Sequence, residues 1–227
     1  MRGILSAGMP GPASLAAMRS YTAVRPVDAV TCAERFEIPG AGPTVAVLDL
    51  GLKASILTSL RRRGCRLLVY PAHTPAGEIL RDRPDGLLLT NGPGNPKDNA
   101  DIIENLRGLA GRLPIFGICL GHQLLALACG ADAQPLRYGH RGSNHPVKDL
   151  DRDRVYITSQ NHGYTVVEES LPANMRVSHR NWNDQTIEGI RYEDHPSFTV
   201  QFHPEASPGP KDTGYLFDEF IGSLTAR

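Results

Sequence analysis

The chain has 227 residues, with 24 Lys and Arg against 24 Asp and Glu, and 41% of its residues are hydrophobic. This length and composition predict one globular domain with a substantial core, and the balanced charge argues against nucleic acid as a partner. Glycines and prolines interrupt the apolar N-terminal residues, so neither a signal peptide nor a membrane span is predicted, and we expect a cytoplasmic protein.

Residues 1–43 are rich in Gly, Ala and Pro and show no sustained periodicity, although residues 14–20 are compatible with a short helix. We expect this segment to be weakly ordered, as a linker or as the remnant of a further N-terminal domain. A regular pattern begins at Thr44. The predicted domain therefore covers residues 44–227.

From Thr44 onward, strands that are apolar throughout alternate with helical segments. Thr74 is the predicted N-cap of the helix over residues 76–81, with Pro75 at its first position. Continuous apolar strands that alternate with helices predict an α/β fold, with an open, mostly parallel sheet flanked by helices on both faces. The expected strands are 45–50, 66–70, 86–90 and 114–118, and the expected helices are 53–63, 76–81, 100–108 and 120–129.

After residue 129 the pattern changes to short alternating segments separated by polar turns, which predicts a smaller, largely antiparallel layer. A last helix is expected over residues 213–224, capped by Asp212, because its apolar residues fall on one face. The expected strands here are 154–158, 165–168, 175–179, 186–192 and 197–202, and the apolar face of the helix is formed by Leu216, Phe217, Phe220, Ile221 and Leu224.

Cys119 is the first catalytic candidate. It follows the apolar strand that ends at Ile118, it lies two residues from Gly117 and from Gly121, and a helical stretch comes next. Such glycines allow the sharp strand-to-helix turn that presents a nucleophile, and a helix N-terminus favours the thiolate. The alternative is a buried core cysteine. The other cysteines, Cys32, Cys65 and Cys129, show no C-x-x-C spacing, so free thiols and no metal site are expected.

A cysteine nucleophile needs a base, and the base needs an orienting group. His203 and Glu205 follow the last predicted strand two residues apart, so in an extended chain they face the same way. The sequence therefore predicts a Cys119–His203–Glu205 triad. Competing histidines, each of which has a structural interpretation, are His122, His140, His145 and His162.

The segment N-G-P-G-N-P, residues 91–96, follows another predicted strand at the edge of the sheet where ligands bind in open α/β folds. Gly92 and Gly94 allow the backbone to turn its N–H groups inward, as an oxyanion hole requires. An ordinary surface turn is the alternative.

Together, G-I-C-L-G-H-Q, N-G-P-G-N-P and H-P-E resemble the motifs of class I glutamine amidotransferases, in the right order from about residue 44 to the C-terminus. Residues 139–147, 159–164 and 204–210 are further similar to the small, glutamine-hydrolysing subunit of carbamoyl phosphate synthetase. The resemblance implies that Cys119, His203 and Glu205 hydrolyse L-glutamine to glutamate and ammonia through a γ-glutamyl thioester. It also implies that Gly92, Gly94 and Leu120 stabilise the oxyanion, and that Gln123, Asn161, Gly163 and Tyr164 hold the substrate.

The same resemblance implies a large synthetase subunit as partner, which receives the ammonia and uses ATP, Mg²⁺ and bicarbonate to make carbamoyl phosphate for arginine or pyrimidine synthesis. No cofactor is expected in this chain. Two departures from the family pattern stand out: a separate N-terminal domain is not matched in residues 1–43, and Asn95 replaces the usual aspartate. An amidotransferase that feeds a different synthetase and a catalytically silent binding module are the alternatives.

Overall fold

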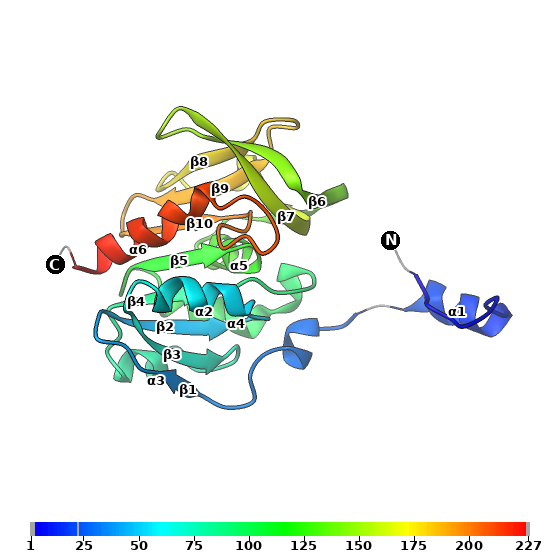
Figure 1. Cartoon of the computed structure of the whole chain (residues 1–227), viewed down its shortest axis with the longest axis horizontal. Helices are drawn as coiled ribbons and strands as arrows, with labels where there is room; N and C mark the ends of the chain where they lie inside the picture. The colour runs from blue at the N-terminus through cyan, green and yellow to red at the C-terminus, as the bar shows by residue number, and fades with distance from the viewer. Residues whose placement is uncertain (1–2, 22, 226–227) are drawn as a thin grey trace.

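A computed structural model describes residues 3–21 and 23–225 and shows one twisted sheet with helices on both faces (Figure 1). The central strands β3, β2, β4, β5 and β10 pair in parallel, and the outer pairs are antiparallel. In sheet order the strands are β1 (Phe36–Ile38), β3 (Arg66–Pro71), β2 (Thr44–Asp49), β4 (Gly86–Leu89), β5 (Ile115–Ile118), β10 (Ser197–Val200), β9 (Ile187–Tyr192), β8 (Met175–Asn181), β6 (Ala133–Asp149) and β7 (Arg154–Val166).

The helices pack on the two faces of the sheet through separate apolar clusters. Side chains of α2 and α6 pack on one face, and those of α3, α4 and α5 pack on the other. The predicted open, mostly parallel α/β fold is therefore confirmed. The helices of this domain are α2 (Ala54–Arg61), α3 (Ala76–Arg81), α4 (Ala100–Arg107), α5 (Leu120–Ala128) and α6 (Tyr215–Thr225).

The antiparallel strands continue the same sheet instead of forming a separate layer, since β10 pairs with β5 on one side and with β9 on the other. The strand β6 was not predicted, and β7 joins two segments that the sequence pattern separates. These two strands form a long hairpin rich in polar and exposed residues, with register shifts in their pairing. Apolar alternation is weak where a strand has little core to cover.

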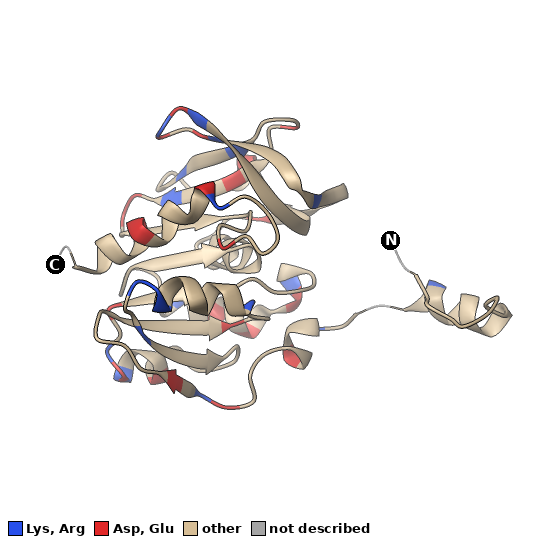
Figure 2. Cartoon of the chain, viewed as in Figure 1, with Lys and Arg blue, Asp and Glu red and all other residues tan. Residues whose placement is uncertain are grey.

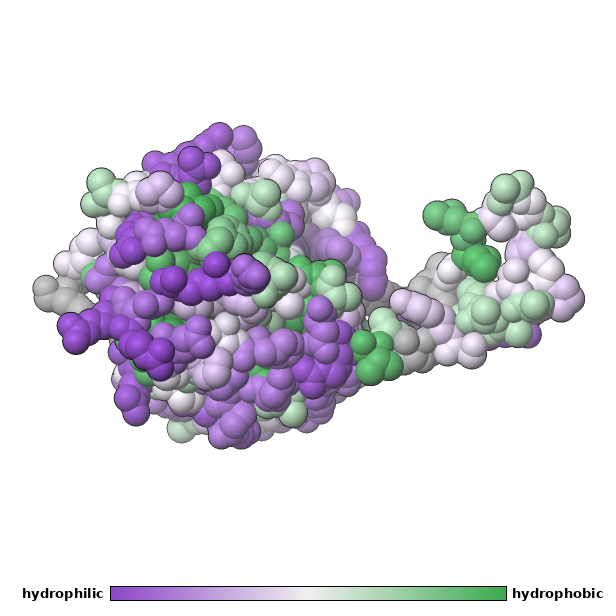
Figure 3. All heavy atoms as spheres, turned by 90° about the horizontal axis from the view of Figure 1, so that it is seen from below, coloured by the Kyte–Doolittle hydropathy of each residue, from purple (hydrophilic) through white to green (hydrophobic). Residues whose placement is uncertain are grey.

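The sheet begins before the predicted domain boundary at Thr44. Val27, in the short helix η1 (Pro26–Ala29), is fully buried in the core, and β1 pairs with β3. By contrast α1 (Pro12–Ser20), which matches the expected short helix, has no buried residue and lies apart from the sheet (Figure 1). Apolar residues are visible on this N-terminal segment in Figure 3. Its interpretation as a linker or remnant stays a prediction.

Two predicted helix caps are wrong. The Thr74 hydroxyl donates to the Pro71 carbonyl, 2.8 Å away, and Pro75 occupies the cap position of α3. Asp212 begins the 3₁₀ turn η4 (Asp212–Gly214) that precedes α6, and does not cap that helix. At Thr74 a local turn competes with the cap for the side-chain hydroxyl.

Acidic and basic residues are interspersed along the helices, strands and loops of the domain (Figure 2). Among the described residues, no helix has the length and apolar character needed to cross a bilayer.

Gly121 shows how closely α5 lies against β4. A Cβ added to Gly121 would lie 2.6 Å from the carbonyl oxygen and from the Cβ of Leu89. These atoms belong to a buried, closely packed strand, so they cannot move far enough to remove the clash with an added Cβ.

We therefore expect Gly121→Ala to lower the free energy of unfolding by about 1–3 kcal/mol through overpacking. Gly222→Ala is the matched control, because Gly222 lies in α6 with nothing within 4 Å of an added Cβ. That control should be neutral or should stabilise by up to ~1 kcal/mol. Urea denaturation measures both, and equal stabilities of the two variants would contradict the packing argument.

Candidate active site

Cys119 lies at the turn between β5 and α5, where it has φ 54° and ψ −103°. This backbone conformation is strained for a residue other than glycine. Its N–H donates to the Val200 carbonyl, 2.9 Å away, which ties the turn to β10. The predicted strand-to-helix turn is present, and the strain falls on the cysteine itself.

The flanking glycines were expected to adopt the backbone angles of the sharp turn, but they serve close packing instead. Gly117 and Gly121 do not have positive φ angles. A Cβ at Gly117 would lie 2.7 Å from the Cγ2 atom of Thr199 and 2.9 Å from the backbone of Gly121. The two glycines therefore allow strand, helix and neighbouring strand to approach closely beneath Cys119.

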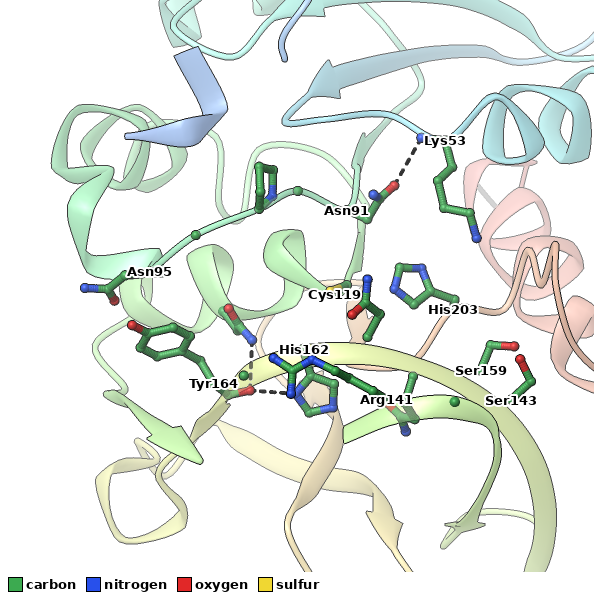
Figure 4. Close-up of a pocket in the computed structure, with 18 of the residues that line it drawn as sticks. Lys53, Asn91, Asn95, Cys119, Arg141, Ser143, Ser159, His162, Tyr164 and His203 are labelled. Atoms are coloured by element: carbon green, nitrogen blue, oxygen red, sulfur yellow. Dashed lines mark hydrogen bonds between the residues drawn. The ribbon is translucent and has the colours of Figure 1, made fainter. Parts of the chain in front are cut away.

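His203 and Glu205 follow the end of β10, and His203 lies beside Cys119 (Figure 4). The Nδ1 atom of His203 is 2.8 Å from Oε1 of Glu205. Burial lowers the pKa of His203, but its hydrogen bonds with Cys119 and with Glu205 raise it more, to about 10. The ring is thus held as an imidazolium beside Cys119.

Lys53 is the member of this cluster that sequence reasoning missed. Its ammonium group is 2.9 Å from Oε1 of Glu205 and donates to the Ala206 carbonyl, 2.6 Å away. Burial raises the pKa of Glu205, yet His203 and Lys53 outweigh it, so the pKa is lowered. Lys53 is 153 residues from Ala206 in the chain, and no local spacing signals this contact.

The glycine-rich loop after β4 forms the opposite side of the site. Gly94 has φ +98°, and Gly92 passes so close to Leu50 that a Cβ would lie 2.3 Å from the Leu50 carbonyl oxygen. Asn91 fixes the loop by donating to the Gly51 carbonyl and accepting from the Lys53 amide, a contact drawn in Figure 4. Leu120 contributes the first backbone N–H of α5. This N–H has no acceptor within the helix, so it is available to a ligand.

Gln123 projects from α5 into the same pocket. Its amide nitrogen donates to the Tyr164 carbonyl, 3.1 Å away, and to Oε1 of Gln201, 2.9 Å away. The amide oxygen of Gln123 is then the atom that can accept a hydrogen bond from a ligand. Asn95, where the family usually has aspartate, accepts from the Lys97 amide and donates to Asp98, so its side chain is occupied in the turn η2 (Pro96–Asp98).

The structure brings the predicted residues together around one pocket of ≈ 1110 Å³, ample for a small molecule. Glu205 and Leu120 lie behind the surface, where Glu205 contacts His203 and Leu120 packs in the core. Lys53, Arg141 and His162 also line the pocket although no role was predicted for them, and His162 belongs to a buried cluster with His140 and Glu188 that can hold a metal ion. Predicted residues on the pocket surface are Cys119, His203, Gly92, Gly94, Gln123, Asn161, Gly163 and Tyr164.

Acyl transfer through a thioester needs a nucleophile, a base with its orienting group, and donors for the oxyanion. This site offers a strained cysteine at a strand-to-helix turn, a histidine–glutamate pair after the neighbouring strand β10, and a glycine loop. A family model, glutamine amidotransferase class-I, matches residues 46–223. The chain therefore belongs to the class-I glutamine amidotransferase family.

More particular relatives are carbamoyl phosphate synthase small chains. The chain is 48% identical over 232 residues to the carbamoyl phosphate synthase small chain of Listeria monocytogenes, covering 100% of this chain and 63% of that relative. It is 54% identical over 196 residues to the carbamoyl phosphate synthase pyrimidine-specific small chain of Halalkalibacterium halodurans, covering 86% of this chain and 54% of that relative. The chain thus spans less than two thirds of either relative.

Among solved structures, a candidate GMP synthase subunit from Thermoplasma acidophilum matches with a TM-score of 0.71 and 22% identity. That match covers 81% of this chain and 94% of the other. A glutamine amidotransferase from Thermotoga maritima matches with a TM-score of 0.58 and 19% identity over 73% of this chain and 77% of the other. At these identities the likeness shows the shared fold.

The site predicts selective alkylation of Cys119 by iodoacetamide near neutral pH. Burial raises the pKa of the Cys129 thiol to about 11, whereas Cys119 lies at the pocket with its sulfur beside the His203 imidazolium. Peptide mass spectrometry should find Cys119 modified first, and His203→Ala should slow its modification about tenfold or more. Cys129 is the internal control, since its rate should not respond to His203→Ala. Equal rates for Cys119 in the two proteins would contradict the pairing.

Proposed function

We propose that this chain hydrolyses L-glutamine to glutamate and ammonia, as the amidotransferase part of a carbamoyl phosphate synthase small chain. The observation that carries the proposal is the Cys119–His203–Glu205 arrangement beside the glycine loop of residues 91–96. The names of the relatives at 48% and 54% identity support the choice within the family.

In the first step the Cys119 thiolate attacks the side-chain amide carbon of glutamine. Negative charge then develops on the carbonyl oxygen, and we assign its stabilisation to the amides of Leu120 and of the Gly92–Gly94 loop. The positive φ of Gly94 and the close passage of Gly92 over Leu50 hold this loop in place before the substrate arrives. Such preorganised donors contribute most where water is excluded.

His203 acts next as the general acid. Its proton goes to the departing nitrogen, so ammonia leaves and a γ-glutamyl thioester forms on Cys119. The now neutral ring takes a proton from water, which attacks the thioester and releases glutamate and the thiolate. Glu205 keeps Nδ1 of His203 engaged at 2.8 Å, and Lys53 holds Glu205 in turn.

The amino-acid end of the substrate is assigned to Gln123, Asn161, Gly163 and Tyr164. These residues line the pocket from α5 and β7, and the Gln123 amide is fixed by the Tyr164 carbonyl. An oriented amide oxygen suits an α-ammonium group, and backbone N–H groups suit an α-carboxylate.

The proposed partner is a carbamoyl phosphate synthase large subunit, which would receive the ammonia and use ATP, Mg²⁺ and bicarbonate. The relatives are called small chains, which supports a larger partner. Because the chain matches 63% and 54% of those two relatives, the assay below is run on the chain alone and with a large subunit.

Cys119→Ser should lower glutamine hydrolysis at least about 1000-fold, because a serine hydroxyl is a far weaker acid than a thiol and stays protonated beside His203. The measurement is glutamate release by the chain alone and with a large subunit. Cys129→Ser is the matched control and should keep the parent activity. Hydrolysis by folded Cys119→Ser at the parent rate would refute the nucleophile, and no hydrolysis by the parent under either condition would refute the function.

Glu205→Gln should move the alkaline limb of the kcat/KM profile to lower pH. The carboxylate raises the pKa of His203, so its removal lets the ring lose its proton at lower pH, and deprotonated His203 cannot give a proton to the departing nitrogen. A displacement of about one unit corresponds to ~1.4 kcal/mol of lost interaction. Glu193→Gln, at an exposed carboxyl, should leave the profile in place. A pH profile unchanged by Glu205→Gln would contradict the proposed role of Glu205 in raising the pKa of His203.

A further inference from the structure

Three buried side chains from different strands meet behind the pocket wall. His140 lies on β6 and His162 lies opposite it on β7, while Glu188 comes from β9 and is fully buried. Their ligand atoms all lie within 4.8 Å of one another. The triad proposed above uses none of the three.

The outer nitrogen of each ring faces an acceptor. Nε2 of His140 is 2.8 Å from a carboxylate oxygen of Asp184, and Nδ1 of His162 is 2.8 Å from the Tyr164 carbonyl oxygen. Since a carboxylate and a carbonyl only accept, each outer nitrogen carries the hydrogen. In a neutral ring the inner nitrogen then presents a lone pair. The inner nitrogens, His140 Nδ1 and His162 Nε2, face each other at 3.2 Å.

Glu188 adds a third acceptor to these two lone pairs. Its Oε1 is 3.3 Å from His140 Nδ1 and 4.0 Å from His162 Nε2. Asn181 donates to Oε1 and Gln160 donates to Oε2, which orients the carboxylate without cancelling its charge. Among the described residues, its ion-pair partners are the two histidines. A buried carboxylate beside two ring nitrogens is stabilised by a positive charge, which either a proton on a ring or a metal ion between the three groups supplies.

The three separations fit a metal ion. A point about 2.1 Å from all three atoms exists, which matches Zn–N and Zn–O bonds of ~2.0–2.2 Å. Asp184 and the Tyr164 carbonyl hold the outer ring nitrogens as the outer partners of zinc-bound histidines do. We propose that His140, His162 and Glu188 bind a divalent transition-metal ion, best matched by Zn²⁺, with water as the further ligand.

Such an ion would join β6, β7 and β9 next to the pocket. His162 lines the pocket and its ring is tied to the Tyr164 carbonyl, which also accepts from Gln123. Figure 4 shows both contacts. The ion would therefore fix the β7 wall of the pocket, and the inference stands whether or not the ligand of that pocket is glutamine.

The test uses the full chain with Cys119→Ser, because a thiolate beside His203 would itself bind Zn²⁺. After chelation and dialysis, titration with Zn²⁺ should give one saturable site, and Co²⁺ should give visible d–d bands without sulfur-to-cobalt charge transfer. At Zn²⁺ a hundredfold above Kd, the midpoint of thermal unfolding should rise by about 5–10 °C.

Glu188→Gln in the same background keeps the size of the side chain and removes its charge. Mutating a residue that only hydrogen-bonds a metal ligand typically weakens metal binding by ~10–100-fold. Glu188→Gln removes a ligand itself, so it should weaken Zn²⁺ binding by more than this and should abolish the rise in the unfolding temperature. Glu193→Gln, at an exposed carboxyl, is the matched control and should bind as the Cys119→Ser protein does. Binding equal in Glu188→Gln and its control, or absence of saturable binding in the Cys119→Ser protein, would overturn the proposal in favour of a proton shared within the cluster.

Discussion

The hydrogen bond from the Cys119 amide to the Val200 carbonyl is the contact on which the site depends. At 2.9 Å it joins the end of β5 to the end of β10, where Val200 pairs with Ile118, and His203 follows three residues later. The parallel register thus fixes the spacing of Cys119 and His203, the proposed nucleophile and base. The same contact holds Cys119 in a backbone conformation that an isolated turn would not keep, because the surrounding strands and helix allow no alternative.

Burial gives the charges of the site their strength and also limits which charges can be present. The side chain of Glu205 is fully buried, which is tolerated because His203 and Lys53 both lie within 3 Å of its Oε1 atom. Each interaction is stronger than in water, and each missing partner would cost more. Within residues 3–21 and 23–225, the groups around the equally buried Glu188 carboxylate are two histidines and two side-chain amides, with no lysine or arginine among them. This lack of a fixed positive charge distinguishes the Glu188 cluster from the Glu205 cluster.

Both halves of the sheet contribute walls to the pocket. Parallel strands bring Cys119, His203 and the glycine loop to one edge, as expected for open α/β sheets. The hairpin of β6 and β7 then supplies the facing wall, and the His203 amide donates to the Ser159 carbonyl of β7 at 2.9 Å. One continuous sheet therefore carries both the reacting groups and the residues assigned to substrate recognition.

The sequence by itself determined the parallel α/β core, the strand-to-helix turn at Cys119 and the pairing of His203 with Glu205, because each depends on local periodicity or on spacings of a few residues. It did not determine the long polar hairpin, whose strands lack a regular apolar face, or the short β1 strand. Nor did it reveal Lys53 beside Glu205 or the meeting of His140, His162 and Glu188. Those contacts join residues that are distant in the chain or lie on different strands, so only the sheet register decided them. Tertiary structure alone also showed that Gly117 and Gly121 serve close packing, since the distance to a neighbouring strand is not encoded in any local pattern.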